Sequence, residues 1–154
     1  MKYLFMISAV LLLSLSTTQA QNGARQNNFN LEKGMLAIQG YDPVGYFTQN
    51  KAIKGKKEFE FNVMGINYWF ASDANRKTFM KDYQKYEPQY GGWCAYAMGK
   101  AGEKVEVDPE TFKIKDGKLY LFYHSFINNT LPKWNEDEAN LKSKADKSWS
   151  TLFK

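Results

Sequence analysis

The residues that could carry chemistry in this chain are few, and the first of them is its single cysteine, Cys94. Met98 follows four positions later, so on a helix the thiol and the thioether would lie on one face. His124 is the only histidine of the chain. A thiolate, a thioether and an imidazole make a soft donor set that suits Cu(I). These residue types therefore predict a metal site for a copper ion, provided that the fold brings His124 to the other two.

Other roles of the cysteine stay open from the sequence alone. A free cysteine is often buried and inert within a core, whereas an accessible thiol of lowered pKa is reactive or forms an intermolecular bond. Because the chain has one cysteine, no disulfide can form within it. Three interpretations of Cys94 remain: a packed thiol, a metal ligand or a reactive thiol.

A second set of residues predicts a binding pocket. Aromatic side chains surround two glycine-rich bends, at Tyr41, Tyr46, Trp69, Tyr90, Trp93 and Tyr96. Rings beside flexible backbone can line a pocket for a small apolar ligand or a protein partner. The same rings would serve equally well as core, because they bury large areas. The alternative to metal handling is therefore a ligand-binding or partner-binding module in which Cys94 is merely buried.

No complete catalytic set is visible in the sequence. Cys94 and His124 form the only obvious pair of nucleophile and base. The chain contains no G-x-S-x-G elbow, phosphate-binding loop, dinucleotide fingerprint or H-E-x-x-H motif. Acidic residues crowd one loop, but their spacing matches no defined calcium loop: Glu103, Glu106, Asp108 and Glu110. The sequence therefore predicts a protein that is not an enzyme.

The N-terminal residues predict export. Lys2 precedes an apolar run from Tyr3 to Leu15, and Thr18 and Ala20 place small residues at the two positions that signal peptidase recognises. We expect residues 1–20 to be a signal peptide whose cleavage releases the protein into the periplasm or the medium. The apolar run is shorter than the roughly 20 residues that a membrane span needs, so no span is expected in the mature protein.

The composition narrows the classes of partner. The chain has 44% hydrophobic and 16% aromatic residues, which suffices for a core without disulfides in a domain of this length. Its formal net charge is +5, yet no basic stripe alternates with aromatic residues, so nucleic acid is not an expected partner. The charge favours at most a weak attraction to an anionic envelope surface.

The rest of the chain predicts a single domain. Residues 21–30 are polar and rich in Asn and Gln, which predicts a disordered leader, and residues 31–154 form the domain. The local signals are hairpin turns at Met64-Gly65 and Asp116-Gly117, helix caps at Asp42 and Ser72, helices over 74–85 and 93–98, and a closing helix that Pro132 opens. This order predicts an α+β fold: a small antiparallel sheet of two hairpins packed by helices, with a C-terminal closing helix.

A strand that ends in an aromatic run precedes one of these helices. The run is Asn67-Tyr68-Trp69-Phe70-Ala71-Ser72, followed by Arg76 and Phe79. This combination resembles the core of the YHS-domain family. The flanking pieces resemble an exported bacterial branch of that family: Gly40 to Val44, Tyr90 to Ala95, Asp108-Pro109 and Asp116 to Tyr120. The resemblance extends from about Leu36 to Trp149 and implies a small α+β domain.

The resemblance also implies a link to metals, because family members attached to copper-transporting ATPases are thought to bind metal through two cysteines. This chain departs from that pattern, since Ala71 stands at the first of these positions and Asn75 lies near the second. The expected function is therefore a non-catalytic exported protein that handles a heavy metal such as copper. It would do so through Cys94, with help from Met98 or His124.

Overall fold

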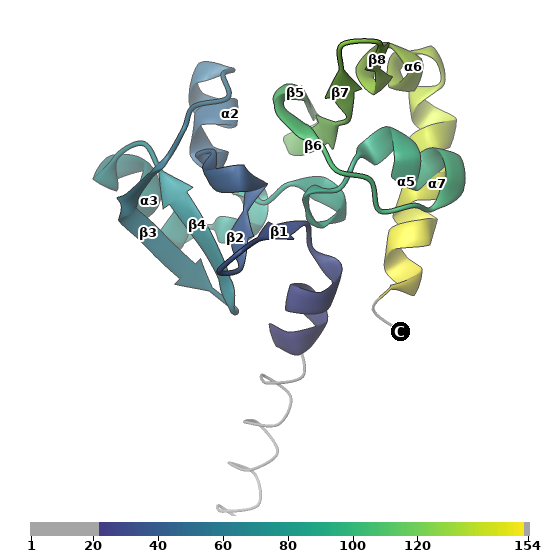
Figure 1. Cartoon of the computed structure of the whole chain (residues 1–154). Helices are drawn as coiled ribbons and strands as arrows, with labels where there is room; N and C mark the ends of the chain where they lie inside the picture. The colour runs from purple at the N-terminus through teal and green to yellow at the C-terminus, as the bar shows by residue number, and fades with distance from the viewer. Residues whose placement is uncertain (1–21, 153–154) are drawn as a thin grey trace, which may run out of the picture.

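The structure, a computed structural model that describes residues 22–152, is an α+β fold of small sheets packed by helices (Figure 1). The fold class predicted from the sequence is confirmed, and the predicted signal peptide lies outside the described residues. The strands are β1 (Leu31–Glu32), β2 (Leu36–Ala37), β3 (Lys56–Val63), β4 (Ile66–Phe70), β5 (Asp108–Lys115), β6 (Lys118–Phe122), β7 (His124–Ser125) and β8 (Asn128–Asn129). The helices are α2 (Pro43–Gln49), α3 (Asp73–Lys81), α4 (Tyr83–Tyr86), α5 (Ala95–Ala101), α6 (Thr130–Glu136) and α7 (Glu138–Thr151), with 3₁₀ turns η1 (Ile38–Gly40) and η2 (Gln89–Gly92).

Both predicted hairpins are present, and each turns at the expected pair of residues. Met64 and Gly65 connect β3 to β4, and Asp116 and Gly117 connect β5 to β6. All four residues have positive φ, at 49° for Met64, 81° for Gly65, 52° for Asp116 and 70° for Gly117. A type I′ turn requires positive φ at both central positions. Local turn chemistry is therefore sufficient to locate these two hairpins.

The two hairpins belong to different sheets, whereas the sequence predicted one sheet. β3 and β4 lie in a sheet of order β1-β2-β4-β3, in which β2 runs parallel to β4, while β5 and β6 form a two-stranded sheet. Residues of β4 and β6 enter the same aromatic core: Ile66, Tyr68, Phe70, Leu119 and Leu121. β4 and β6 therefore share a core through their side chains, and no strand pairing joins the two hairpins in the described part of the chain. A third short hairpin, β7–β8, was not predicted.

A buried carboxylate connects α2 to the first sheet. Asp42 is 0% exposed and caps α2, where its Oδ1 accepts the Val44 N–H at 2.8 Å. Its Oδ2 accepts the Ala71 N–H directly after β4 at 2.8 Å and the Asn75 side-chain N–H of α3 at 2.6 Å. Hydrogen bonds to a charged acceptor are roughly twice as strong as neutral ones. Asp42 therefore fixes three elements relative to one another, and the predicted cap is confirmed.

Helix α2 extends this arrangement to the second sheet. The hydroxyl of the buried Tyr46 donates to the Pro109 carbonyl at 2.9 Å, and its ring packs edge-on against Phe112 with centroids 4.8 Å apart. Burial is the main cause that raises the pKa of Tyr46 above its usual value. The hydroxyl thus keeps its proton and remains a donor to β5.

The predicted disordered leader is wrong, because residues 22–28 form a helix that packs against the domain. Arg25 forms an ion pair with the largely buried Glu87, and the Tyr68 hydroxyl donates to the same carboxylate at 2.7 Å. Burial alone lowers the pKa of Arg25, but the hydrogen bond and charge of Glu87 raise it above its usual value. A polar composition is typical of disorder, yet these partners lie far along the chain, where composition cannot reveal them.

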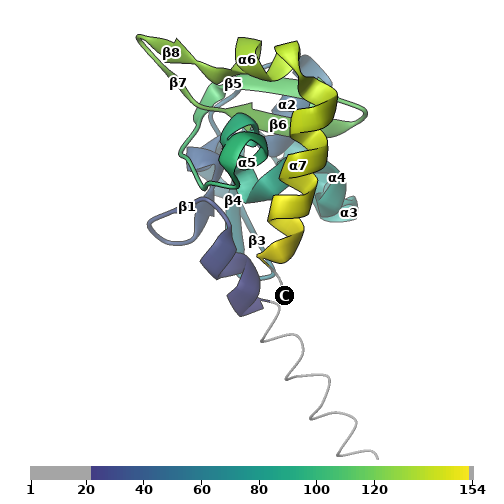
Figure 2. The same ribbon diagram turned by 90° about the vertical axis from the view of Figure 1, so that its right-hand side faces the viewer.

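The C-terminal part closes the fold as two helices rather than the one predicted. α6 ends at Glu136 and α7 begins at Glu138, with Asp137 between them at a non-helical φ of −145°. α7 then runs back along α5 (Figure 1, Figure 2). Gly99 permits this approach, because a Cβ there would clash with the Leu141 carbonyl. The contact with α7 therefore fixes the position of α5.

Replacing Asp42 by alanine should lower the free energy of unfolding by about 3 kcal/mol or more, because one buried donor and two half-buried donors lose their acceptor. Chemical denaturation followed by tryptophan fluorescence measures this change. Asp82→Ala is the control, since Asp82 is exposed and its side chain caps no helix. That variant should change the free energy of unfolding by less than about 0.5 kcal/mol. Equal small losses in both variants would contradict the role given to Asp42.

Candidate functional site

A pocket of about 330 Å³ lies beside Cys94, between α5 and the chain segment that leads from β6 into α6. Sites for small molecules usually span roughly 300 to 1,000 Å³, so this pocket suits a small ligand. Its residues come from α5, from the loop that follows α5 and from the segment around β7–β8. The position of α5 against α7 therefore decides whether the pocket exists.

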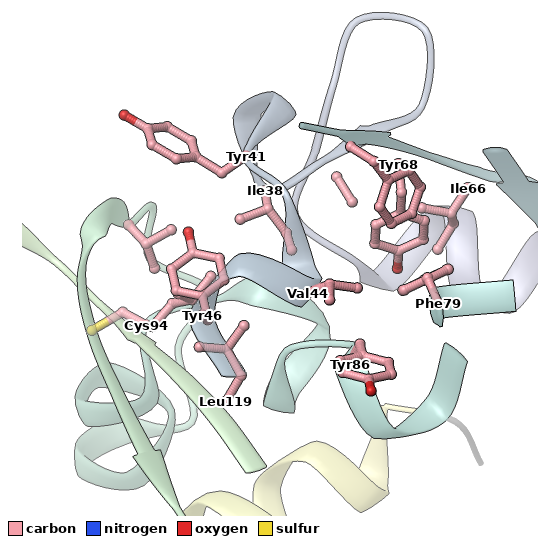
Figure 3. Packing of buried hydrophobic residues seen from close by; sticks show 14 residues of the cluster. Ile38, Tyr41, Val44, Tyr46, Ile66, Tyr68, Phe79, Tyr86, Cys94 and Leu119 are labelled. Carbon is pink, nitrogen blue, oxygen red and sulfur yellow. The ribbon is translucent and has the colours of Figure 1, made fainter. Parts of the chain in front are cut away.

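Cys94 is fixed by main-chain hydrogen bonds at the start of α5. Its N–H donates to the Val105 carbonyl at 3.0 Å, and its own carbonyl accepts the Met98 N–H at 3.0 Å. The residue is 0% exposed. Figure 3 shows its side chain at the edge of the aromatic core, with the sulfur directed away from the centre. The expected helix over 93–98 begins later, at Ala95, so Cys94 is its N-cap.

The thiol belongs to a small hydrogen-bonded group. The Tyr123 N–H donates to Cys94 Sγ at 3.3 Å, and Thr130 Oγ1 lies 3.4 Å from the same sulfur. The Thr130 hydroxyl gives its own proton to the Tyr123 carbonyl at 2.9 Å. It can therefore only accept from the sulfur, so the arrangement fits a protonated thiol that donates to Thr130. This group connects the start of α5 to the start of α6.

The wall of the pocket is mostly apolar and its rim is polar. Four half-buried residues, which also pack against the core, supply most of the wall: Tyr96, Ala97, Val105 and Tyr123. Lys100 and Glu103 line the pocket at exposed positions. Asn128 completes the rim, and its side-chain oxygen accepts from Lys133 Nζ at 2.7 Å. The pocket therefore offers an apolar surface beside two ammonium groups and one carboxylate.

The three predicted metal ligands contact different groups of residues. Cys94 belongs to the aromatic core described above, whereas Met98 is buried in the second core cluster, around α7. The His124 Nδ1 lies 3.0 Å from Thr111 Oγ1 and 3.3 Å from Asp108 Oδ2. Within residues 22–152, no group of three or more His, Cys, Asp or Glu side chains is placed to hold a metal ion. The copper site stays a prediction.

The five aromatic residues predicted to line one pocket are dispersed. None of the five lines the Cys94 pocket: Tyr41, Tyr46, Trp69, Tyr90 and Trp93. Their polar atoms donate to five different residues: Tyr41 to Glu110, Tyr46 to Pro109, Trp69 to Glu60, Tyr90 to Asp146 and Trp93 to Asn28. Trp69 lines a pocket of about 320 Å³ beside β4, and Tyr90 lines one of about 290 Å³ beside α7. The predicted single aromatic pocket is therefore wrong, although Tyr96 does line the Cys94 pocket.

Sequence reasoning missed most residues of the Cys94 pocket. Ala97, Lys100 and Val105 belong to no motif, and Tyr123 and Thr130 belong to none that predicts a pocket. All five come from segments that only the packing of α5 brings together. The one usable local signal is the residue before Thr130, an asparagine whose side chain caps α6. That signal places Thr130 at a helix start but does not reveal its contact with the sulfur.

Comparisons with known proteins gave no match, whether to protein-family models, to curated proteins or to solved structures. The resemblance to the YHS-domain family therefore stays a prediction, as do the signal peptide and export. Among residues 22–152, none of the helices combines the length and the apolar character that crossing a membrane requires. The function has to be argued from the geometry of the site itself.

The thiol of Cys94 should be strongly protected in the folded protein, because it is buried and its sulfur lies 3.4 Å from the Thr130 hydroxyl. We expect it to react with a disulfide reagent such as DTNB at least about 100-fold more slowly than in the same chain unfolded by guanidinium, because the thiolate must be accessible to react. Absorbance of the released thionitrobenzoate measures both rates. A folded rate close to the unfolded rate would show an accessible thiol and contradict this placement.

Proposed function

We propose that this chain is a non-catalytic binding module and that its site is the Cys94 pocket. The observation that supports this most is the contrast between the apolar wall and the polar rim, where Lys100 and Glu103 stand at exposed positions. Sites of this kind place the apolar body of a ligand against the wall and orient it through a few polar groups. The expected ligand is therefore a small amphipathic molecule.

The charges at the rim favour an anionic head group. Lys100 lines the pocket, and the Lys133 ammonium lies at the same rim through its bond to Asn128. Glu103 is the one carboxylate among the residues that line the pocket. Lys100 and Glu103 balance each other among the lining residues, so the excess positive charge comes from Lys133 at the rim, and this charge favours an anion. A fatty carboxylate combines this head with an apolar body.

The thiol is part of the wall in this proposal, and it is not a nucleophile. A nucleophilic cysteine is activated by a base within hydrogen-bond reach or by a lowered pKa, and it must be accessible, whereas Cys94 is 0% exposed. The sulfur of Cys94 instead contacts Tyr123 and Thr130. The imidazole of His124, the only one in the chain, contacts Thr111 through its Nδ1. Copper handling through Cys94, with Met98 or His124, remains a prediction of the sequence that no described contact favours.

Decanoate below its micellar concentration is a suitable probe, because it joins a straight alkyl chain to a carboxylate. We expect equimolar binding by isothermal titration calorimetry. Ala97→Phe, which puts a ring into the pocket, should weaken binding at least about tenfold, or about 1.4 kcal/mol. Ala139→Phe adds the same ring at an exposed position of α7 and should leave the affinity unchanged.

The head group can be tested separately from the apolar body. Lys100→Gln should weaken the binding of decanoate but not that of decanol, which lacks the charge. The proposal is contradicted if the unmodified protein does not bind decanoate, or if Ala97→Phe binds it as tightly as Ala139→Phe does.

A further inference from the structure

The hairpin β7–β8 bears the most exposed large apolar side chains of residues 22–152. Phe126 is 104% exposed and Ile127 is 90% exposed, and both lie at the tip between the two strands. Figure 2 shows this hairpin extending away from the body of the protein, next to α6. Adjacent apolar side chains that project fully into solvent are unfavourable for an isolated protein, so they mark a surface that binds something.

The base of this hairpin is anchored, so the tip is presented in a fixed position. His124 pairs with Asn129 across the two strands, and its ring contacts Thr111 of β5 at 3.0 Å. The Thr130 N–H donates to the Tyr123 carbonyl at 3.1 Å. Anchoring at the base reduces the backbone conformational entropy that the hairpin loses when its tip binds.

The tip lies in a basic part of the chain. Residues 118–135 contain no Asp or Glu. The ammonium group of Lys133 donates to Asn128, the first residue after the tip, and Lys100 lines the same pocket as Asn128. Lys133 therefore lies next to the apolar tip, and Lys100 lines the pocket that begins at Asn128, which makes the region complementary to an anionic surface with an apolar interior.

Two carboxylates also lie near the base of the hairpin. Asp108 faces His124, with 3.3 Å between its Oδ2 and the ring Nδ1. Glu103 lines the pocket together with Lys100. Neither belongs to the hairpin, but Glu103 lines the same pocket as Asn128 and Lys100, so it offsets one of the two ammonium groups and Lys133 supplies the remaining charge.

We propose that the tip formed by Phe126 and Ile127 docks the protein on an anionic lipid surface. The two apolar side chains enter the interface while Lys133 and Lys100 attract the anionic head groups. A second copy of this chain is a poorer occupant, because its own tip brings the same positive charges. Two side chains and two ammonium groups give weak and reversible binding rather than permanent anchoring.

Docking also has a consequence for the Cys94 pocket. Asn128 and Thr130 line that pocket and directly follow the tip, so a docked protein has the mouth of the pocket at the level of the lipid head groups. An amphipathic ligand can then pass between the bilayer and the pocket. This consequence rests on the proposed function, whereas the docking itself does not.

Vesicle flotation tests the docking. The chain from Gln21 to Lys154 is used, because it contains every contact described above and lacks the apolar run from Tyr3 to Leu15, whose own lipid affinity would mask the tip. We expect it to float with vesicles of phosphatidylglycerol and phosphatidylcholine in equal parts, but not with phosphatidylcholine alone. Added salt should weaken the binding, because it screens the lysines.

Matched variants distinguish binding through the tip from nonspecific hydrophobic adsorption to the vesicles. Replacing Phe126 and Ile127 together by serine should weaken vesicle binding at least about tenfold. Met80→Ser removes another exposed apolar side chain, 48% exposed on α3, and should change nothing. Circular dichroism confirms that each variant is folded.

Three outcomes would overturn the docking proposal. The first is that the unmodified chain does not bind anionic vesicles, and the second is that the serine variant floats as well as the unmodified chain. The third is a dimer in sedimentation equilibrium without lipid that the serine variant abolishes, which would assign the tip to a second copy.

The two proposals can fail independently. The serine variant should bind decanoate in solution as the unmodified chain does, because the tip does not line the pocket. Ala97→Phe should still float with anionic vesicles. Loss of vesicle binding alone therefore overturns the docking, and loss of decanoate binding alone overturns the proposed function.

Discussion

The buried carboxylate of Asp42 is the constraint from which the arrangement of this fold follows. A buried charge must be satisfied by donors, and Asp42 accepts from α2, from the end of β4 and from α3. These bonds fix the direction of α2, and Tyr46 on α2 then contacts β5 through Pro109. Since β5 pairs with β6, and β6 leads directly to Tyr123, the position of one wall of the pocket depends on this carboxylate.

The opposite wall depends on how closely α5 approaches α7. Gly99 permits that approach, and the hydrogen bonds of Cys94 then connect the start of α5 to Tyr123 and Thr130. The cysteine is thus primarily a structural link, and the space beside it is the candidate site. Because the polar rim of that space adjoins the β7–β8 hairpin, ligand binding and surface docking become two uses of the same end of the protein.

Features encoded over a few neighbouring residues could be predicted from the sequence. The turns at Met64-Gly65 and Asp116-Gly117 and the cap at Ser72 all follow from local backbone requirements. Features that depend on distant partners could not be predicted. The helix over 22–28 is stabilised by Glu87, and the pocket is assembled from segments with no common motif. Cys94 stands out in the sequence, but the residue types suggest soft metal ligands as its partners, whereas its sulfur contacts a main-chain N–H and a hydroxyl.

Amide NMR during a titration with decanoate shows where a small amphipathic ligand binds. If the Cys94 pocket is the site, the largest shift changes occur at the amides of Ala97, Tyr123 and Thr130, and they saturate at equimolar ligand. Changes centred on Trp69 or Tyr90, which line the other two pockets described above, would place the ligand elsewhere. The absence of any saturable change would show that decanoate does not bind.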